Sequence, residues 1–172
     1  MKEVKKTFTV LGIDPGTNST GYGILSQTGS SFSVIDYGCI KPPRSKPIEE
    51  RNLIMFEGIC ALLDAHTIHA FSVESQYVSK NPQSAIKLGM AKGIALLAAT
   101  MRGLPTMQFA PSQAKLAVTG SGRASKEGVQ KMIKTLLSLD ELPPDDAADA
   151  LALAFCYFHH QKPITTQKTS YV

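Results

Sequence analysis

The chain has 172 residues, a net charge of +4 and three cysteines, Cys39, Cys60 and Cys156. This length suffices for one hydrophobic core, and three cysteines without a CxxC spacing argue against both a disulfide framework and a zinc site. No apolar run approaches membrane-spanning length and the basic first residues make a poor signal peptide, so we expect a cytoplasmic protein with no membrane partner.

The first forty residues predict an antiparallel meander of three strands. Apolar side chains fill residues 8–13, and Pro15-Gly16 with Asn18-Ser19 marks a tight turn before a second run at 20–25. A third run follows at 31–40. Because the connections are short, neighbouring strands should pair antiparallel.

From residue 48 onward, helical and strand patterns alternate. Apolar spacing predicts helices over 48–65, from Asn81 to about Met101, and over 112–120, 125–139 and 146–160, with short strands at 70–75 and 105–109. Asn81, Ser125 and Asp145 are the expected helix caps. We therefore expect an α/β fold, a mixed five-stranded sheet with helices on both faces, as a single domain over 1–160 with a polar tail at 161–172.

Four carboxylates stand out from this pattern. Asp14 ends the first strand, where an unpaired charge needs a partner, a cation or solvent, and Glu74 lies at the end of the strand at 70–75. Asp146 and Asp149 share one face of the last helix. Helix capping would explain Asp146, but it explains Asp149 badly because alanines and a leucine surround it. We predict that the four acids meet at one edge of the sheet.

A cluster of four acids repels itself unless cations neutralise it. Oxygen-only ligands suit Mg²⁺, with Mn²⁺ as a substitute, and two ions roughly 4 Å apart would clamp the attacking water and the leaving oxygen of a phosphodiester. Nine basic residues against one acid, Glu127, lie between Ser75 and Lys134 and favour a polyanionic substrate. Any single lysine among them is equally well explained as part of a solvated helix face.

Four ordered segments carry a resemblance to a known family: GIDPGTNSTGYGIL, VESQYVSKNPQSAIKLGMAKG, APSQAKLAVTGSGRASKEGVQ and DDAADALALA. Together they resemble the RuvC family, the bacterial Holliday-junction resolvases, from about Val10 to His160. The resemblance implies a ribonuclease-H-like fold, a homodimer with two active sites, and Mg²⁺-dependent nicking of two opposed strands in a four-way DNA junction, leaving ligatable ends. It also implies cooperation with RuvA and RuvB in recombination and repair. The family's four catalytic acids fall on Asp14, Glu74, Asp146 and Asp149.

The resemblance also points to residues that would bind DNA. An aromatic residue follows the family's glutamate and is proposed to stack on bases, and here it is Tyr77, which would otherwise be a half-buried tyrosine at a strand end. Lys115 and Lys126 match lysines expected to hold the phosphate backbone. Arg123, in the glycine-rich stretch TGSGRASK, would reach a phosphate or remain solvated.

Small residues recur along the helix expected from Asn81 to Met101. Ala85, Gly89, Gly93 and Ala95 would allow another backbone to approach closely. RuvC-like proteins dimerise around this helix, so the pattern is consistent with a homodimer. The alternative is that these glycines pack on the chain's own sheet.

Three other functions are compatible with parts of the sequence. The stretch DPGTNSTGYG resembles the phosphate loop of actin-like ATPases, but those proteins need a second copy of it, which this chain lacks. A ribonuclease-H-like nuclease acting on RNA or an RNA–DNA hybrid remains open. A non-catalytic DNA-binding module is disfavoured because all four acids are present.

Overall fold

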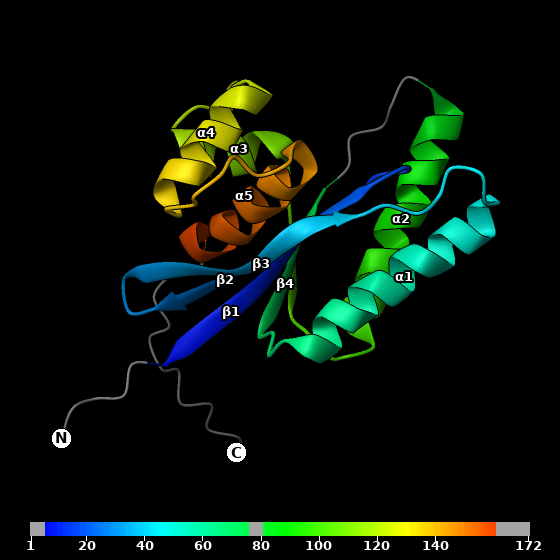
Figure 1. The fold of residues 1–172 in the computed structure, drawn as a ribbon, viewed down its shortest axis with the longest axis horizontal. Helices are drawn as coiled ribbons and strands as arrows, with labels where there is room; N and C mark the ends of the chain where they lie inside the picture. The colour runs from blue at the N-terminus through cyan, green and yellow to red at the C-terminus, as the bar shows by residue number, and fades with distance from the viewer. Residues whose placement is uncertain (1–5, 76–80, 161–172) are drawn as a thin grey trace, which may run out of the picture.

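The computed structural model describes residues 6–75 and 81–160, and Figure 1 shows their arrangement. In chain order the elements of this part are β1 (Thr7–Asp14), β2 (Thr20–Thr28), β3 (Ser31–Ile40), α1 (Ile48–Ala65), β4 (Ala70–Glu74), α2 (Pro82–Thr100), β5 (Thr106–Phe109), α3 (Pro111–Thr119), α4 (Lys126–Leu136) and α5 (Asp145–His160). Each expected helix and strand is confirmed in type. Their ends differ by a few residues, most clearly in β2, which continues to Thr28.

The five strands form one mixed sheet in the order β3-β2-β1-β4-β5. β1 pairs antiparallel with β2, and β2 pairs antiparallel with β3, which confirms the meander. β4 lies parallel to β1, and β5 lies parallel to β4. This topology places β1 in the middle of the sheet, so its carboxyl end lies between β2 and β4.

Helices cover both faces of the sheet (Figure 1). Because successive side chains of a strand point to opposite faces, Val10 contributes to one core and Leu11 to the other. The Val10 core is completed by α3, α4 and α5 through residues such as Val118 and Ile133. The Leu11 core is completed by α1 and α2. The expected α/β architecture is therefore confirmed.

Two of the three expected helix caps are confirmed. The Asn81 side chain accepts hydrogen bonds from the backbone of Gln83 and Ser84, and Ser125 Oγ accepts one from Gly128 N. The prediction for Asp145 was wrong, because α5 begins at that residue. The carbonyl oxygen of the preceding residue already accepts the first helical bond, so Asp145 belongs to the first turn rather than capping it.

Two sequence predictions fall outside the described residues: Tyr77 and the polar tail at 161–172. Among the helices of residues 6–75 and 81–160, none combines the length and the apolar character needed to cross a membrane.

Candidate active site

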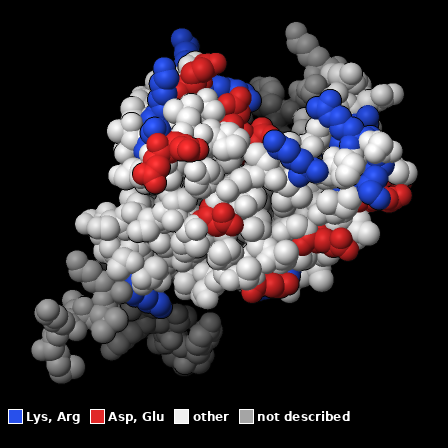
Figure 2. Space-filling view, in the orientation of Figure 1, with Lys and Arg blue, Asp and Glu red and all other residues white. Residues whose placement is uncertain are grey.

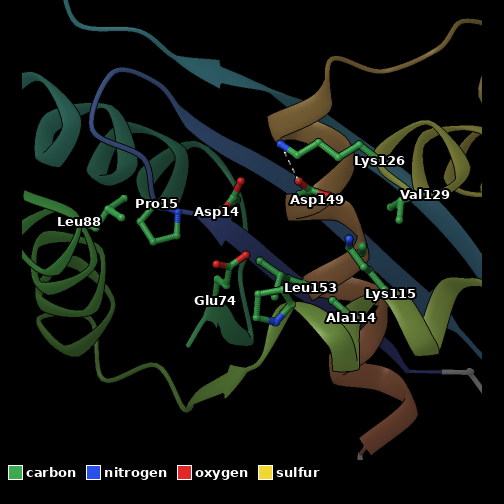
Figure 3. A pocket seen from close by; sticks show the side chains of 12 residues that line it. Asp14, Pro15, Glu74, Leu88, Ala114, Lys115, Lys126, Val129, Asp149 and Leu153 are labelled. Atoms are coloured by element: carbon green, nitrogen blue, oxygen red, sulfur yellow. Dashed lines mark ion pairs between the residues drawn. The ribbon is translucent and has the colours of Figure 1, made fainter. Parts of the chain in front are cut away.

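Asp14 and Glu74 end two neighbouring parallel strands. In the register of β1 and β4, Ile13 lies opposite Val73, so the residue after each emerges at the same edge of the sheet. Both side chains line a cavity of about 320 Å³. Figure 3 shows their carboxylates near one another in this cavity, which we call the acidic cavity. As predicted, these two acids lie together at one edge of the sheet.

Helix α5 brings the other two acids to this edge by packing its backbone directly on the sheet. A Cβ atom on Gly12 of β1 would lie 2.0 Å from the carbonyl oxygen of Ala150, and one on Gly21 of β2 would lie 1.9 Å from that of Asp146. No side chain fits at either strand position, so glycine sets the separation between helix and sheet. Farther along the helix, Ser72 Oγ of β4 donates a hydrogen bond of 2.8 Å to the carbonyl oxygen of Leu153.

The two acids of α5 lie differently. Asp149 is partly buried and lines the acidic cavity with Asp14 and Glu74. Asp146, one turn earlier, is also partly buried but is not among the lining residues. Its charge nevertheless raises the pKa of both Asp14 and Asp149. The structure thus places three of the predicted acids in one cavity and the fourth at its margin.

Burial and mutual repulsion make this cluster hard to ionise. The pKa of Asp14 rises from 3.8 to about 8, first because of burial and then because of the charges on Glu74, Asp149 and Asp146, with Lys126 acting in the opposite direction. Burial also raises the pKa of Glu74 and of Asp149. Near neutral pH, the positive charge close to these acids is therefore too small for all of them to be ionised at once.

The donor set of the cavity fits a hard divalent cation. It offers carboxylate oxygens and no cysteine or histidine among its lining residues, and such ligands suit Mg²⁺ or Mn²⁺. A cation would also supply the charge that the buried acids lack. Within residues 6–75 and 81–160, however, no group of three or more His, Cys, Asp or Glu side chains is already arranged to hold a metal ion.

Two predicted lysines line the acidic cavity on the side across from Asp14 and Glu74, where Asp149 also lies (Figure 3). Lys126, at the start of α4, has its Nζ 4.0 Å from Asp149 Oδ2. Lys115, on α3, donates from Nζ to the carbonyl oxygen of Ala124 at 2.9 Å and so ties α3 to the start of α4. Arg123 is exposed and is not among the residues that line the cavity.

The surface around the cavity carries both signs of charge. In Figure 2, Lys and Arg side chains gather at the upper end of the molecule, over α4 and near the ends of α1 and α2, with acidic side chains between them. This arrangement would hold a polyanion on both sides of an acidic centre.

Sequence reasoning missed several residues that shape the site. Gly12 and Gly21 carried a usable signal, since glycine inside a strand often marks close approach of another backbone. Arg51 of α1 carried none, yet its guanidinium donates hydrogen bonds to the carbonyl oxygen of Thr17 and to Asn18 Oδ1, in the loop that follows Asp14.

Comparison with known proteins identifies the family. The family model described as "Crossover junction endodeoxyribonuclease RuvC" matches residues 10–157. A Protochlamydia amoebophila protein with the same name is 54% identical over 159 residues, which cover 92% of this chain and 94% of that relative. The chain belongs to the RuvC family. A RuvC of Pelotomaculum thermopropionicum is 43% identical over 152 residues, covering 88% of this chain and 93% of its own length.

Solved RuvC structures agree with this assignment. The structure of "T. thermophilus RuvC in complex with Holliday junction substrate" superposes with a TM-score of 0.82 at 33% identity, covering 88% of this chain and 93% of the other. The ribonuclease-H-like fold expected from the resemblance is therefore confirmed.

Proposed function

We propose that this chain is a crossover junction endodeoxyribonuclease that resolves Holliday junctions in DNA recombination and repair. It would hydrolyse one phosphodiester in each of two opposed strands and leave ends that a ligase can seal. The observation that carries this proposal is the acidic cavity, which three acids, Asp14, Glu74 and Asp149, line together with Lys115 and Lys126. It lies in a chain that aligns with RuvC relatives over nearly its whole length.

DNA is favoured over RNA as the substrate. The relatives at 54% and 43% identity are both named endodeoxyribonucleases, and the RuvC structure with a TM-score of 0.82 holds a Holliday junction. An RNA–DNA hybrid, which the sequence left open, has no comparable support. A cytoplasmic location and cooperation with RuvA and RuvB are further parts of the proposal, and both rest on the resemblance to the bacterial resolvases.

The catalytic groups in this proposal are the four acids, Asp14, Glu74, Asp146 and Asp149, which would hold two Mg²⁺ ions per subunit, with Mn²⁺ able to substitute. Bound there, the metal would supply a more acidic water and charge stabilisation at the scissile phosphate. Asp14 is the natural centre of the group because the charges of the three other acids all act on it. Lys126 and Lys115 would offset the repulsion between these acids and an approaching phosphate.

Replacing Asp14 tests the assignment. Asp14→Asn should abolish nicking at saturating Mg²⁺ and leave junction binding equal or tighter, because one negative charge facing the phosphate is removed. Asp140→Asn is the matched control, since Asp140 is an exposed aspartate in the loop between α4 and α5. Normal cleavage by Asp14→Asn would contradict the proposed role of the acids.

The remaining DNA contacts of the proposal involve Tyr77, Lys115, Lys126 and Arg123. Lys115 and Lys126 have the strongest support because both line the acidic cavity. The exposure of Arg123 at the edge of the α3–α4 loop leaves it accessible to a backbone phosphate. Tyr77 rests on the family resemblance and on the value of base stacking, roughly 1–3 kcal/mol per base.

A homodimer is part of the proposal, because cutting two opposed strands requires two active sites. Its support is an apolar stripe along α2 and its C-cap residue: Ile86, Met90, Leu97 and Met101 expose 41–65% of their surface. Gly89 and Gly93 lie on the same helix face, and a Cβ on either would meet no atom within 4 Å. The alternative that these glycines pack on the chain's own sheet was therefore wrong.

The oligomeric state tests this surface. Met90→Glu should shift the protein from dimer to monomer in analytical ultracentrifugation, because a charge would be buried at the interface. Leu142→Glu is the control, since Leu142 is an apolar residue exposed at 49%, against 41% for Met90, but lies outside α2. A dimer that survives Met90→Glu unchanged would place the interface elsewhere.

A cleavage assay tests the function as a whole. The purified protein is mixed with a four-way DNA junction, a matched linear duplex and an RNA–DNA hybrid, each with Mg²⁺ or with EDTA, and the products are offered to ligase. Paired, ligatable nicks in the junction alone, absent with EDTA, are expected. Cutting of the hybrid instead would move the function to an RNA-directed nuclease.

A further inference from the structure

A second cavity of about 250 Å³ lies next to the acidic cavity. Leu88 of α2 lines both, and Figure 3 shows it beside Pro15, at the start of the loop between β1 and β2. The polar side chains of the second cavity come from that loop, α1 and α2: Thr17, Asn18, Arg51, Ser84 and Lys87. No carboxylate is among its lining residues, so we call it the basic cavity.

Arg51 brings an uncompensated positive charge to the basic cavity. Its Nη2 donates to the carbonyl oxygen of Thr17 and, at 2.9 Å, to Asn18 Oδ1. Neither acceptor carries a formal charge, and Arg51 forms no ion pair with any acid in the described part of the chain. Its Nε and the nearby Ser19 Oγ are the two buried side-chain polar atoms of the described residues that lack a hydrogen-bond partner. A buried donor without a partner calls for an explanation, and a bound water or ion is one; of these two residues, Arg51 lines the basic cavity.

Lys87 adds a second positive charge. It is exposed on α2 and, like Arg51, forms no ion pair with a described acid. Ser84, one turn earlier on the same helix face, contributes a hydroxyl donor. Two cations with hydroxyl and amide donors suit an oxyanion with several acceptor oxygens, and they repel a metal ion.

We propose that the basic cavity binds a second phosphate of the DNA backbone, one that is not cleaved, while the acidic cavity holds the scissile phosphate. The inference rests on the proposed function. A strand of DNA advances about 3.4 Å per nucleotide along its axis, so adjoining cavities would meet phosphates only a few nucleotides apart. The chain gains from such a site because the acidic cavity alone repels the phosphate that must enter it. Attraction at a non-reacting phosphate offsets that repulsion and fixes the register of the strand.

Lys87→Gln, with Lys6→Gln as control, provides the first test. Lys6 is also exposed, but it precedes β1, at the opposite end of that strand from Asp14. Junction affinity is measured in EDTA, where binding occurs without cleavage, over a series of salt concentrations. Lys87→Gln should weaken binding by about tenfold and reduce the slope of log affinity against log salt by about 1. Lys6→Gln should match the wild type in both.

The second test locates the phosphate. Phosphates on either side of the cut are replaced, one at a time, by neutral methylphosphonates, and the affinities of wild type and Lys87→Gln are compared. At one position, the methylphosphonate should lower the affinity of the wild type but hardly that of Lys87→Gln, because the variant already lacks the contact between Lys87 and that phosphate.

The possible outcomes distinguish a failure of this inference from a failure of the proposed function on which it rests. A wild-type protein that binds the junction no better than a linear duplex overturns the proposed function and the inference with it. If the wild type binds and cleaves normally, equal behaviour of Lys87→Gln and Lys6→Gln overturns the basic cavity alone. The basic cavity is also overturned if, at every position, a methylphosphonate lowers the affinity of the wild type and of Lys87→Gln by the same factor.

Discussion

Replacing the ionisable side chain of Asp14 by an amide should stabilise the metal-free protein. This aspartate ends a strand whose preceding residues, Val10, Leu11 and Ile13, are completely buried, and its own pKa is raised to about 8 by burial and by its acidic neighbours. The folded protein therefore binds the Asp14 proton more tightly than the unfolded chain does. Stability linked to this proton is complete below the ordinary pKa of 3.8 and is lost as the pH rises toward 8.

The size of the effect follows from the two pKa values. Each pH unit above the ordinary pKa costs the folded state about 1.4 kcal/mol until the raised pKa is reached, which amounts to about 4 kcal/mol near neutral pH. Asp14→Asn keeps the shape of the side chain and has no such cost. The free energy of unfolding of the variant should therefore exceed that of the wild type by an amount that grows from near zero at about pH 4 to a few kcal/mol at about pH 7.

Urea unfolding in EDTA at a series of pH values measures this difference, with Asp140→Asn as a control that removes an exposed carboxylate. Adding Mg²⁺ should reduce the difference in free energy of unfolding between the two proteins. The cation stabilises the ionised acids of the wild type, whereas the variant has one fewer acid for it to neutralise. A difference that does not change with pH, or an Asp14→Asn protein less stable than the wild type at neutral pH, would refute the reasoning.

Three further outcomes are expected. Lys126→Ala should weaken junction binding and lower the salt slope by about 1 if its Nζ contacts a phosphate; an unchanged slope and cleavage rate would show that Lys126 is a solvated surface residue without a phosphate contact. Gly21→Ala should destabilise the protein by at least about 1–3 kcal/mol in urea unfolding, since its Cβ would overlap the backbone of Asp146; wild-type stability would contradict the close helix–sheet contact. In the folded protein Cys39 and Cys60 should react with a thiol reagent well before Cys156, whose pKa burial raises to about 11; equal rates for all three thiols would contradict that burial.

Local sequence patterns were enough to predict most of the fold and the acidic cluster. The apolar run of β1 predicted a buried strand, which fits side chains that face helices on both sides of the sheet, and Asp14 stood out because it interrupts that run. Asp149 was recognisable for the same reason, as a charge among small apolar residues of a helix that turned out to be buried.

What the sequence could not supply was the three-dimensional spacing. Gly12 and Gly21 indicate that another backbone approaches closely, but only the structure shows that α5 is that backbone and lies about 2 Å from where their side chains would be. Arg51 looks like any surface residue of an amphipathic helix until its guanidinium is seen on the loop after Asp14. Both depend on contacts between segments far apart in the chain, and no local pattern specifies which segments meet.

The order of the elements has a consequence for synthesis in the cell. Asp14 and Glu74 lie in the first half of the chain, whereas Asp146 and Asp149 lie on α5, the last helix that the structure describes. A nascent chain still on the ribosome therefore carries only half of the acidic cluster until α5 has emerged and closed onto Gly12 and Gly21. Any fragment that ends before residue 145 lacks the complete cluster, so a truncated translation product would be released without all four of the acids that we propose as catalytic.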